Sequence, residues 1–538
     1  MRQAVPRHQW QLPDIDPARV EALGAAMGVS RPLAALLLAR GHDSGAKVKA
    51  FLRPGFTFRP DGRDFKNGEA SVARIVRALR DGEPILIHGD YDVDGTCGAV
   101  IFHRALTALG GRTRIFLPNR FKDGYGVAPK AIGWGIREGY KLLITSDTGS
   151  QAHEAIQRAL DGGLDVVVTD HHQLGERPLA TPYFINPQQE DCGYPYKGLS
   201  GGGIALKVCL AVAEELGQEI AYDELVPLAT LSTIADVCPL TEENRGLVRE
   251  GLTLFPKVRQ PGLRELVHKV LVEHGKLTTR DLSHGLIPKL NAIGRLGHPQ
   301  LAVDLLLCSE LAKARALARQ LEDRNAERKA IQESVAAQAF KQAEQMLATE
   351  RDLCCLVLAS PHWHFGVLGI VAAKVVDKFG VSSILLSQHQ EQARKGPDGA
   401  PYHYTGSGRA PAGVPLLTAL ESCRDLLVHF GGHHQALGLA IEAQQLDAFR
   451  QRLAETLRTL EVARPVLEID AHLAPAELDL RLMKELEQLE PCGAGNPQPV
   501  FAVGPLYVAS SKTVGDGTHR QLVLQDGEGR EIRGIHFS

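Results

Sequence analysis

The sequence lacks the features of a membrane protein, a secreted protein or a strongly basic protein. It contains no run of about 18 apolar residues, which excludes an ordinary membrane-spanning helix, and residues 1–14 have no apolar core of a signal peptide. The formal net charge is −3, so nucleic-acid binding would need a local basic groove. We therefore expect a soluble, cytoplasmic protein with no membrane partner.

The cysteines form no recognisable disulfide or metal-binding motif. The nine are dispersed, with Cys354 and Cys355 adjacent, and include no CxxC. This is typical of reduced thiols and argues against both a disulfide framework and a zinc site. With 538 residues, the chain is too long for a single core, and about two to four domains are expected.

Acidic residues are concentrated in the stretch 85–99, ILIHGDYDVDGTCGA, which begins with a short apolar run that predicts a buried strand. The polar residues that follow are His88, Asp90, Asp92 and Asp94. Gly95 then permits a tight turn into a helix predicted over 96–109. Carboxylates this close repel one another unless a cation is present, so the stretch predicts a hard-metal site at a strand end. The alternative is a solvated acidic turn.

Strands and helices alternate from about 85 to 250. Further apolar runs predict strands over 113–118, 141–146 and 165–170. Because amphipathic helices separate these runs, we predict an α/β fold with a doubly wound parallel sheet. More polar residues stand where predicted elements end: Asp147, Asp170, His171, His172 and Asp236.

These polar residues can meet, because the carboxyl ends of parallel strands lie at one edge of a sheet. So many carboxylates suit two divalent cations, with one carboxylate bridging them. The mixture of oxygen and imidazole ligands favours Mn²⁺ or Mg²⁺ over zinc. Taken singly, each Asp could instead be a helix N-cap and each His a packed or surface residue.

Five segments are predicted along the chain. They are an N-terminal arm over 1–70 that packs on the first domain, a first α/β domain over 71–300, a long helix over 301–350, a second α/β domain over 351–460 and a small β-barrel over 461–538. The long helix has no Gly or Pro between Ser309 and Glu350 and would span roughly 60 Å. We interpret it as a connector between lobes, with a coiled-coil or bundle helix as the alternative. The chain stops inside a predicted strand, so we expect the native C-terminus further on.

The order of four motifs, HGDYDVDG, SDTG, TDHH and IADVCPL, resembles that of the DHH phosphoesterase superfamily. The flanking segments resemble one branch, the bacterial RecJ family of single-strand-specific exonucleases: PNRFKDGYG, PKLNAIGRL, HWHFGVLGIVAAK, GSGRA and GGHHQALGLA. The resemblance extends from about residue 70 to the end of the sequence. It implies a DHH domain, a long connecting helix, a DHH-associated domain that binds substrate and a C-terminal OB-fold.

The resemblance also implies roles for the polar residues. One ion would be held by His88, Asp92 and Asp147, and the other by Asp94, Asp147, His171 and Asp236. His172 would contact the scissile phosphate, and Asp170 would orient the histidine pair. Asp90 is skipped by the superfamily pattern and would have a supporting role. Thr148 departs from the family, where Asn commonly follows the Asp.

Substrate recognition is expected mainly in the second lobe. A Gly-rich loop there, with Gly406, Ser407, Gly408 and Arg409, and a second with Gly431, Gly432 and His433, would bind phosphate. Arg120 and Tyr125 could pair with phosphate and stack on a base, and Arg295 lies in GRLG. The alternatives are tight turns for the glycines and structural ion pairs for the arginines.

The implied activity is 5′-to-3′ hydrolysis of single-stranded DNA to 5′-mononucleotides in DNA repair and recombination, with two Mn²⁺ or Mg²⁺ ions. The strand would run from the OB-fold through a groove between the lobes. The family suggests a monomer that works with single-strand-binding protein and a recombination helicase. Two alternatives are a DHH phosphodiesterase acting on short oligonucleotides or cyclic dinucleotides, and a non-catalytic DNA-binding relative.

Overall fold

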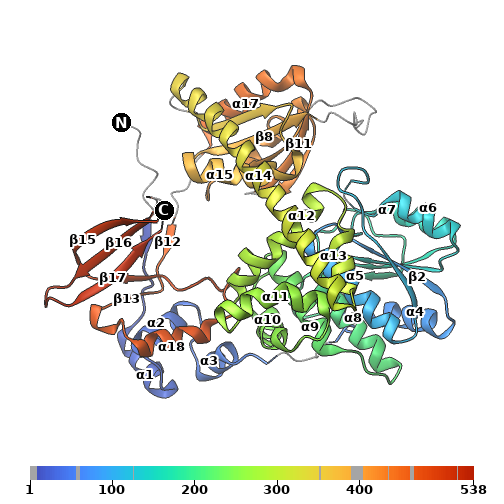
Figure 1. Cartoon of the computed structure of the whole chain (residues 1–538), viewed down its shortest axis with the longest axis horizontal. Coiled ribbons are helices and arrows are strands. Elements are labelled where there is room, and N and C mark those ends of the chain that lie inside the picture. Colours follow the sequence, from blue (N-terminus) through green and yellow to red (C-terminus); the bar gives the residue numbers. More distant parts are fainter. Residues whose placement is uncertain are drawn as a thin grey trace. The chain divides into compact units, whose positions relative to one another are not determined.

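The computed structural model describes residues 9–55, 61–124, 126–350, 353–388, 404–433, 436–460, 466–515, 517 and 519–537 (Figure 1). The chain divides into a larger unit, Gln11–Leu321 with Glu468–Ser538, and a smaller unit, Met1–Trp10 with Glu322–Leu467. Tyr125 and the side chain of His433, both predicted to bind substrate, lie outside the described part.

A five-stranded parallel sheet forms the centre of the larger unit. Its strands in spatial order are β3 (Arg112–Phe116), β2 (Pro84–Gly89), β4 (Leu142–Ser146), β5 (Asp165–Thr169) and β6 (Tyr183–Ile185). The chain passes from β2 to β3 on one side and then to β4 on the other, so the direction of winding reverses between β2 and β4. The predicted doubly wound sheet is confirmed, and such a reversal is where ligands bind in these folds.

Both faces of this sheet are covered by helices, which explains the unbroken apolar runs of its strands. Helices α6 (Pro129–Arg137) and α7 (His153–Asp161) pack against Leu86 on one face. On the other face, Ile85 and Ile87 pack in a core shared with α4 (Gly68–Arg80), α5 (Val93–Ala108), α8 (Gly201–Glu215) and α9 (Tyr222–Ala235). Successive residues of β2 therefore point to opposite faces of the sheet and pack in two different cores.

The segment after α9 is mostly helical, which sequence patterns did not reveal. It contains α10 (Glu242–Leu254), α11 (Pro261–His274), the π-helix η2 (Asp281–Leu286), α12 (Ile287–Leu296) and α13 (Gln300–Leu307). The motif PKLNAIGRL lies on α12, and its Leu290 and Ile293 are buried in the core that α4, α5, α8 and α9 share with the parallel sheet.

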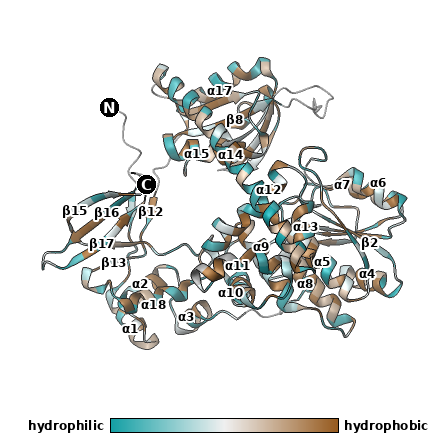
Figure 2. Ribbon diagram, viewed as in Figure 1, coloured by the Kyte–Doolittle hydropathy of each residue, from teal (hydrophilic) through white to brown (hydrophobic). Residues whose placement is uncertain are grey.

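The predicted long helix is confirmed as α14, Leu311–Thr349, with 39 residues. Ala314 and Leu321 of its first part are buried in the core of the larger unit, and Val335, Ala339 and Ala343 are buried in a core of the smaller unit. Figure 2 shows hydrophilic and hydrophobic residues alternating along it. Because each part is packed in a different core, the structure favours a connector over a free-standing coiled coil.

A mixed five-stranded sheet forms the smaller unit, as expected for a second α/β domain. Its strands in spatial order are β10 (Leu427–His433), β11 (Ala436–Ile441), β9 (Tyr404–Arg409), β8 (Ser382–Gln388) and β7 (Cys355–Ser360). Only the β7–β8 pair is parallel. The helices of this unit are α15 (Leu368–Phe379), α16 (Leu416–Glu421) and α17 (Leu446–Thr459), together with the second part of α14.

The prediction of two Gly-rich loops in this region was wrong, because Gly406–Arg409 lies in β9 and Gly431–His433 lies in β10. Glycine serves close packing there. A Cβ on Gly406 would come within 2.3 Å of the Leu385 carbonyl oxygen, and one on Gly432 within 2.4 Å of the Ala436 carbonyl oxygen. At Gly406 and Gly432, glycine therefore reflects crowded neighbouring strands rather than turns.

The C-terminal region is rich in β-structure, as predicted. Strands β15 (Tyr507–Val514), β16 (His519–Gln525) and β17 (Glu531–His536) form an antiparallel sheet, and β13 (Ala471–Leu473) pairs with β14 (Phe501–Val503). Helix α18 (Leu480–Leu486) lies between β13 and β14 in the chain, and β12 (Val466–Glu468) pairs with β1 (Gln9–Gln11). Closure of these strands into a barrel stays a prediction.

The N-terminal helices α1 (Pro17–Met27), α2 (Arg31–Ala39) and α3 (Gly45–Leu52) share a hydrophobic core with Ala471 and Leu489 of the C-terminal region. They reach the first domain through Arg245 and Arg249 of α10, which donate to carbonyl oxygens of α3. No single helix in the described ranges is long and apolar enough to span a membrane, although α1 and α2, bent by 112°, pass that test as a pair.

Candidate metal centre

The acidic loop connects β2 to α5 at the winding reversal. Asp92 is the N-cap of α5, and its Oδ1 accepts a hydrogen bond from the Gly95 backbone N–H at 3.1 Å. Gly95 is needed here because a Cβ would lie 2.3 Å from the Asp90 nitrogen. The close approach of the helix to the loop keeps the carboxylates of Asp90, Asp92 and Asp94 together.

Asp90, Asp92 and Asp147 form one cluster, in which one carboxylate oxygen of each lies within 4.8 Å of the others. Burial, first, and the nearby carboxylates, second, raise the pKa of each of the three. Oδ1 of Asp90 is buried without a hydrogen-bond partner. Such a cluster is costly unless protons or cations neutralise it. The structure thus brings Asp90, which the family pattern skips, into contact distance of two predicted ligands.

Asp147 stands where β4 ends and has a φ of 62°. This left-handed conformation is uncommon outside glycine, although Asp adopts it more readily than most residues. This conformation turns the Asp147 side chain away from the strand and toward Gly201. Only glycine fits at position 201, because a Cβ there would lie 2.6 Å from the Asp147 Cβ. The next residue, Thr148, is buried, and its carbonyl oxygen accepts a hydrogen bond from Thr145 Oγ1 at 2.7 Å.

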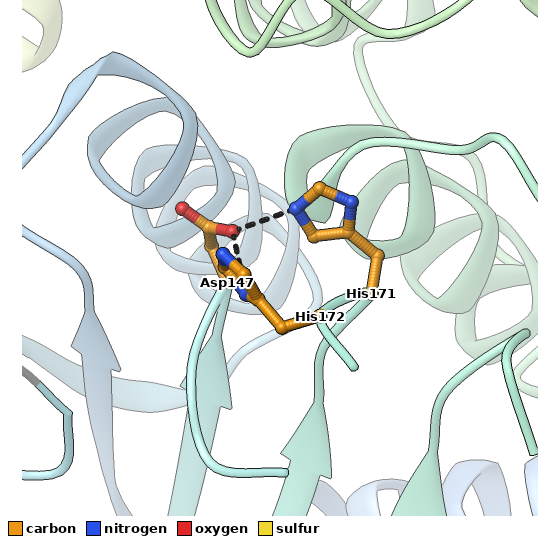
Figure 3. A group of neighbouring side chains, drawn as sticks. All are labelled: Asp147, His171 and His172. Carbon is orange, nitrogen blue, oxygen red and sulfur yellow. Dashed lines mark hydrogen bonds and ion pairs between the residues drawn. The ribbon is translucent and has the colours of Figure 1, made fainter. Parts of the chain in front are cut away.

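His171 points its Nε2 at three carboxylates. The Nε2 atom lies 3.0 Å from Asp147 Oδ1, 3.5 Å from Asp94 Oδ2 and 3.6 Å from Asp236 Oδ2, and Figure 3 shows the contact with Asp147. These four residues are the set that the resemblance implies for one ion. They come from four separate places in the chain, and the structure brings them together.

His172 is held by Asp170, whose Oδ1 lies 2.7 Å from Nδ1. Burial alone would lower the pKa of His172, but this hydrogen bond and the surrounding carboxylates raise it to about 9. Burial alone would raise the pKa of Asp170, but hydrogen bonds from His172 and Ser150 hold it at about 2. His172 is therefore an imidazolium at neutral pH. Its ring also lies beside Asp147, with Nδ1 3.7 Å from Oδ1 (Figure 3).

Sequence reasoning missed the donors that hold Asp94. The backbone N–H groups of Gly201 and Gly202 donate to its two oxygens at 2.9 and 2.8 Å, and Ser232 Oγ donates to Oδ1. The N-terminus of α8 therefore faces a carboxylate, as helix N-termini commonly do. The three consecutive glycines after the N-cap Ser200 were the available signal, because they mark a close approach to the start of a helix.

His88 does not join any of the metal-binding groups found among the described residues. Burial lowers its pKa to about 4, so the ring is neutral. Its Nε2 accepts a hydrogen bond from the Ala128 backbone N–H at 3.1 Å, which leaves the proton on Nδ1, a buried atom without a partner. The ligand role of His88 stays a prediction.

The residues present fit divalent cations. Oxygen donors dominate, imidazole is the minority donor, and the carboxylates are too close together to be ionised side by side without positive charge. Hard or borderline ions such as Mg²⁺ and Mn²⁺ match this donor set. Asp147 contributes to the cluster with Asp90 and Asp92 and also contacts His171, which is the arrangement expected of a bridging ligand.

Two of the predicted substrate residues lie beside the acidic loop. The Arg120 guanidinium is 5.3 Å from the centre of the Tyr91 ring. Burial raises the pKa of Tyr91 to about 12, and the positive charges of Arg120 and Arg295 oppose that rise. A Cβ on Gly294, next to Arg295 in α12, would lie 2.7 Å from the Tyr91 carbonyl oxygen. Both arginines therefore lie close enough to Tyr91 to act on it electrostatically, and the charge of Arg120 also opposes the rise in the pKa of Asp90.

The remaining predicted substrate residues belong to the smaller unit. Arg409 Nη1 donates to Ser407 Oγ at 3.0 Å and to the Gly408 carbonyl oxygen at 2.7 Å. A Cβ on Gly369, at the start of α15, would lie 2.8 Å from Arg409 Nη2 and 3.0 Å from Ser407 Oγ. The guanidinium and hydroxyl thus converge on a helix start that lacks a side chain. Gly432 is exposed in β10.

Three family models match the chain. They are the DHH family N-terminal domain over residues 84–233, the DHHA1 domain over 352–459 and the RecJ OB domain over 469–538. The first covers the parallel sheet and most of the candidate metal ligands, the second covers the mixed sheet, and the third covers the C-terminal strands.

Proteins named single-stranded-DNA-specific exonuclease RecJ are similar over nearly the whole chain. The one from Dickeya dadantii is 33% identical, and the alignment covers 99% of this chain and 91% of that protein. The one from Bacillus subtilis is 32% identical, with 96% of this chain covered, and this chain spans 64% of that protein's length.

Solved structures agree. The crystal structure of RecJ from Thermus thermophilus in complex with Mn²⁺ matches with a TM-score of 0.83 at 29% identity, covering 98% of this chain and 74% of that one. The Mg²⁺ complex of the same protein matches with a TM-score of 0.77 at 28% identity, covering 98% and 72%. The motif order, the metal-centre geometry and these similarities together show that the chain belongs to the RecJ family of single-stranded-DNA-specific exonucleases of the DHH phosphoesterase superfamily.

Proposed function

We propose that this chain hydrolyses single-stranded DNA from the 5′ end and releases 5′-mononucleotides, with two Mn²⁺ or Mg²⁺ ions at the centre formed around Asp147. The observation that carries the proposal is the meeting of His171 Nε2 with Asp94, Asp147 and Asp236 at 3.0–3.6 Å. Bound divalent ions would lower the pKa of the attacking water and stabilise charge on the phosphoryl group and leaving oxygen.

The ligands would divide between two positions. Asp94, Asp147, His171 and Asp236 would hold one ion, and Asp92, Asp147 and His88 the other. The cluster of Asp90 with Asp92 and Asp147 supports adding Asp90 to the second group. Asp147 would bridge both.

His172 would act on the scissile phosphate. Its ring is fixed by the hydrogen bond to Asp170, and in the protonated form it would hold a phosphoryl oxygen by a charge-assisted hydrogen bond. With the strand bound, the ring nitrogen that does not face Asp170 would donate to that oxygen. Asp170 would position the ring and keep it protonated.

The 5′ end would be recognised by Ser407, Gly408 and Arg409 of β9, with Gly432 and His433 of β10 as further contacts. Arg120, Tyr125 and Arg295 would contact the rest of the DNA strand. The pairing of Arg409 with Ser407 at the start of α15 supports a phosphate site, because a guanidinium, a hydroxyl and a helix N-terminus all favour phosphate oxygens. The RecJ OB domain match over 469–538 supports single-strand binding by β15–β17.

A product analysis tests the proposal. Single strands labelled at the 5′ or the 3′ end would be incubated with Mn²⁺, Mg²⁺ or a chelator, beside a blunt duplex and a dinucleotide. We expect metal-dependent release of labelled mononucleotide from the 5′-labelled strand at the earliest times, and little cleavage of the duplex. First release from the 3′ end, equal cleavage of the duplex, or a preference for the dinucleotide would contradict the proposal.

We also propose that the protein is a cytoplasmic monomer that works with single-strand-binding protein and a recombination helicase. This rests on family resemblance. Sedimentation equilibrium of the purified chain tests the monomer, and a pull-down with each purified partner tests the interactions.

A further inference from the structure

Cys238 is folded back against the metal centre by an unusual helix end. Helix α9 stops at Ala235, and Val237 has a φ of 56°, a conformation that β-branched residues rarely adopt. The reversed chain lets the Cys238 backbone N–H donate to the Thr233 carbonyl oxygen at 3.1 Å. The Cys238 side chain is thereby buried, with 6% of its surface exposed, whereas Val237 is 70% exposed.

The thiol lies among groups already assigned to cation binding. Its Sγ is 3.3 Å from Asp236 Oδ2, and the same Oδ2 is 3.6 Å from His171 Nε2. One donor atom each from His171, Asp236 and Cys238 all lie within 4.8 Å of one another. The cluster therefore offers sulfur, nitrogen and oxygen to one point, whereas the cluster of Asp90, Asp92 and Asp147 offers only oxygen.

These donors differ in the ions they prefer. Carboxylates suit Mg²⁺ and Mn²⁺, whereas a thiolate with imidazole suits Zn²⁺ and other soft ions. We infer that His171, Asp236 and Cys238 form a binding position for thiophilic divalent ions, represented by Zn²⁺ and Cd²⁺. The ion would replace the thiol proton, which passes to the buffer, and would take Nε2 and a carboxylate oxygen as its other protein ligands.

This position shares His171 and Asp236 with the proposed Mn²⁺ site. Zn²⁺ or Cd²⁺ would therefore compete with Mn²⁺ for two ligands. The bound Zn²⁺ or Cd²⁺ would lie closer to the Cys238 sulfur than Mn²⁺ does. The competition rests on the proposed function, but the binding of a thiophilic ion does not. No CxxC marks this position in the sequence, because its three donors come from the loop after β5 and from the end of α9.

The test is a titration of the metal-free full chain with Cd²⁺. Binding is monitored through the ultraviolet charge-transfer absorption of the cadmium–thiolate bond. We expect absorption that saturates at one equivalent, disappears in Cys238→Ser, and moves to higher Cd²⁺ concentration when Mn²⁺ is in excess. Asp236→Asn keeps the thiol but should also abolish saturation at one equivalent, because binding needs the carboxylate.

Cys308→Ser is the matched control. Cys308 is as buried as Cys238, at 7% exposure, and its Sγ also lies 3.3 Å from an oxygen, the Glu310 carbonyl, but it belongs to none of the described metal-binding groups. The control should retain the absorption. Saturable absorption in Cys238→Ser, or its loss in Cys308→Ser, would overturn the inference, as would unchanged Cd²⁺ binding in Asp236→Asn. A Mn²⁺-dependent nuclease assay of the unsubstituted chain tests the proposed function separately.

Discussion

Asp94 is held in place by groups that are not themselves metal ligands. Two backbone N–H groups at the start of α8 and the hydroxyl of Ser232 bind its two oxygens. Ser232 in turn lies 2.7 Å from the N-cap Ser200. A fixed carboxylate loses little freedom when an ion binds, so these donors should contribute to metal affinity although none of them touches the ion.

Ser232→Ala should therefore weaken Mn²⁺ binding. Outer contacts of this kind typically change metal affinity by about 10- to 100-fold, and we expect a loss in that range, measured by calorimetric titration. Thr233→Val is the control, since Thr233 Oγ1 lies 3.1 Å from Ser200 Oγ but makes no described contact with Asp94. Equal Mn²⁺ affinity in Ser232→Ala and the unsubstituted chain would contradict this role.

The buried carboxylates also predict a pH dependence. Burial raises the pKa of Asp90, Asp92 and Asp147, and burial with repulsion from Asp94 raises that of Asp236 to about 6. A raised carboxylate pKa means that the metal-free centre retains protons at pH values where free Asp is ionised. Because a cation needs the ionised forms, Mn²⁺ should displace protons, and its affinity should fall as the pH decreases through about 6.

Proton release can be measured by titrating Mn²⁺ into the protein in two buffers with different ionisation enthalpies. The apparent binding enthalpies should differ by an amount that gives the number of protons released, and the number should decrease in Asp236→Asn. Identical enthalpies in the two buffers at pH 6 would show that the centre is already ionised.

At the scale of elements, sequence patterns predicted the strands of the parallel sheet and the polar residues at their ends, because local interactions determine both. Strands β2, β4 and β5 are apolar on both faces because helices cover both faces, and each ends in polar residues because its carboxyl end meets the metal centre. The glycines of β9 misled the prediction, since close strand packing and a turn both select glycine. The contact of α12 with the acidic loop was not predictable, because nearly 200 residues separate Asn291 from the Val93 nitrogen that it binds at 3.3 Å.

That contact makes helix α12 a support for the acidic loop, and Gly294→Ala tests it. The added Cβ would lie 2.7 Å from the Tyr91 carbonyl oxygen, so the helix or the loop must move. We expect weaker Mn²⁺ binding and lower nuclease activity with little change in the helix content seen by circular dichroism.

Gly285→Ala is the matched control for Gly294→Ala. Gly285 lies in the adjoining π-helix, and no heavy atom lies within 4 Å of the position of an added Cβ. This variant should bind Mn²⁺ as the unsubstituted chain does. Normal Mn²⁺ affinity in Gly294→Ala would show that the loop does not depend on α12.

At the scale of the whole molecule, distant segments converge on one buried side chain in the larger unit. Arg245 of α10 donates to the Phe51 carbonyl oxygen and to the carbonyl oxygens of four consecutive residues, 488–491. Its guanidinium also lies 4.0 Å from the centre of the Phe51 ring. No sequence pattern singles out this arginine, because its acceptors are backbone atoms and carry no residue identity.

Arg245→Ala should loosen the N-terminal helices from the rest of the larger unit. Burial lowers the pKa of Arg245 to about 10, so the group is still charged at neutral pH and binds the carbonyls as a cation. Without it, several buried carbonyls lose a donor at about 1–3 kcal/mol each, and we expect a total loss of about 3 kcal/mol or more. Relative to the unsubstituted chain, the Arg245→Ala variant should show a larger increase in the rate of hydrogen exchange in α1–α3 than in β2–β5. The exposed Arg264→Ala serves as the control, and unchanged exchange in α1–α3 of Arg245→Ala would show that their own core with Ala471 and Leu489 is sufficient.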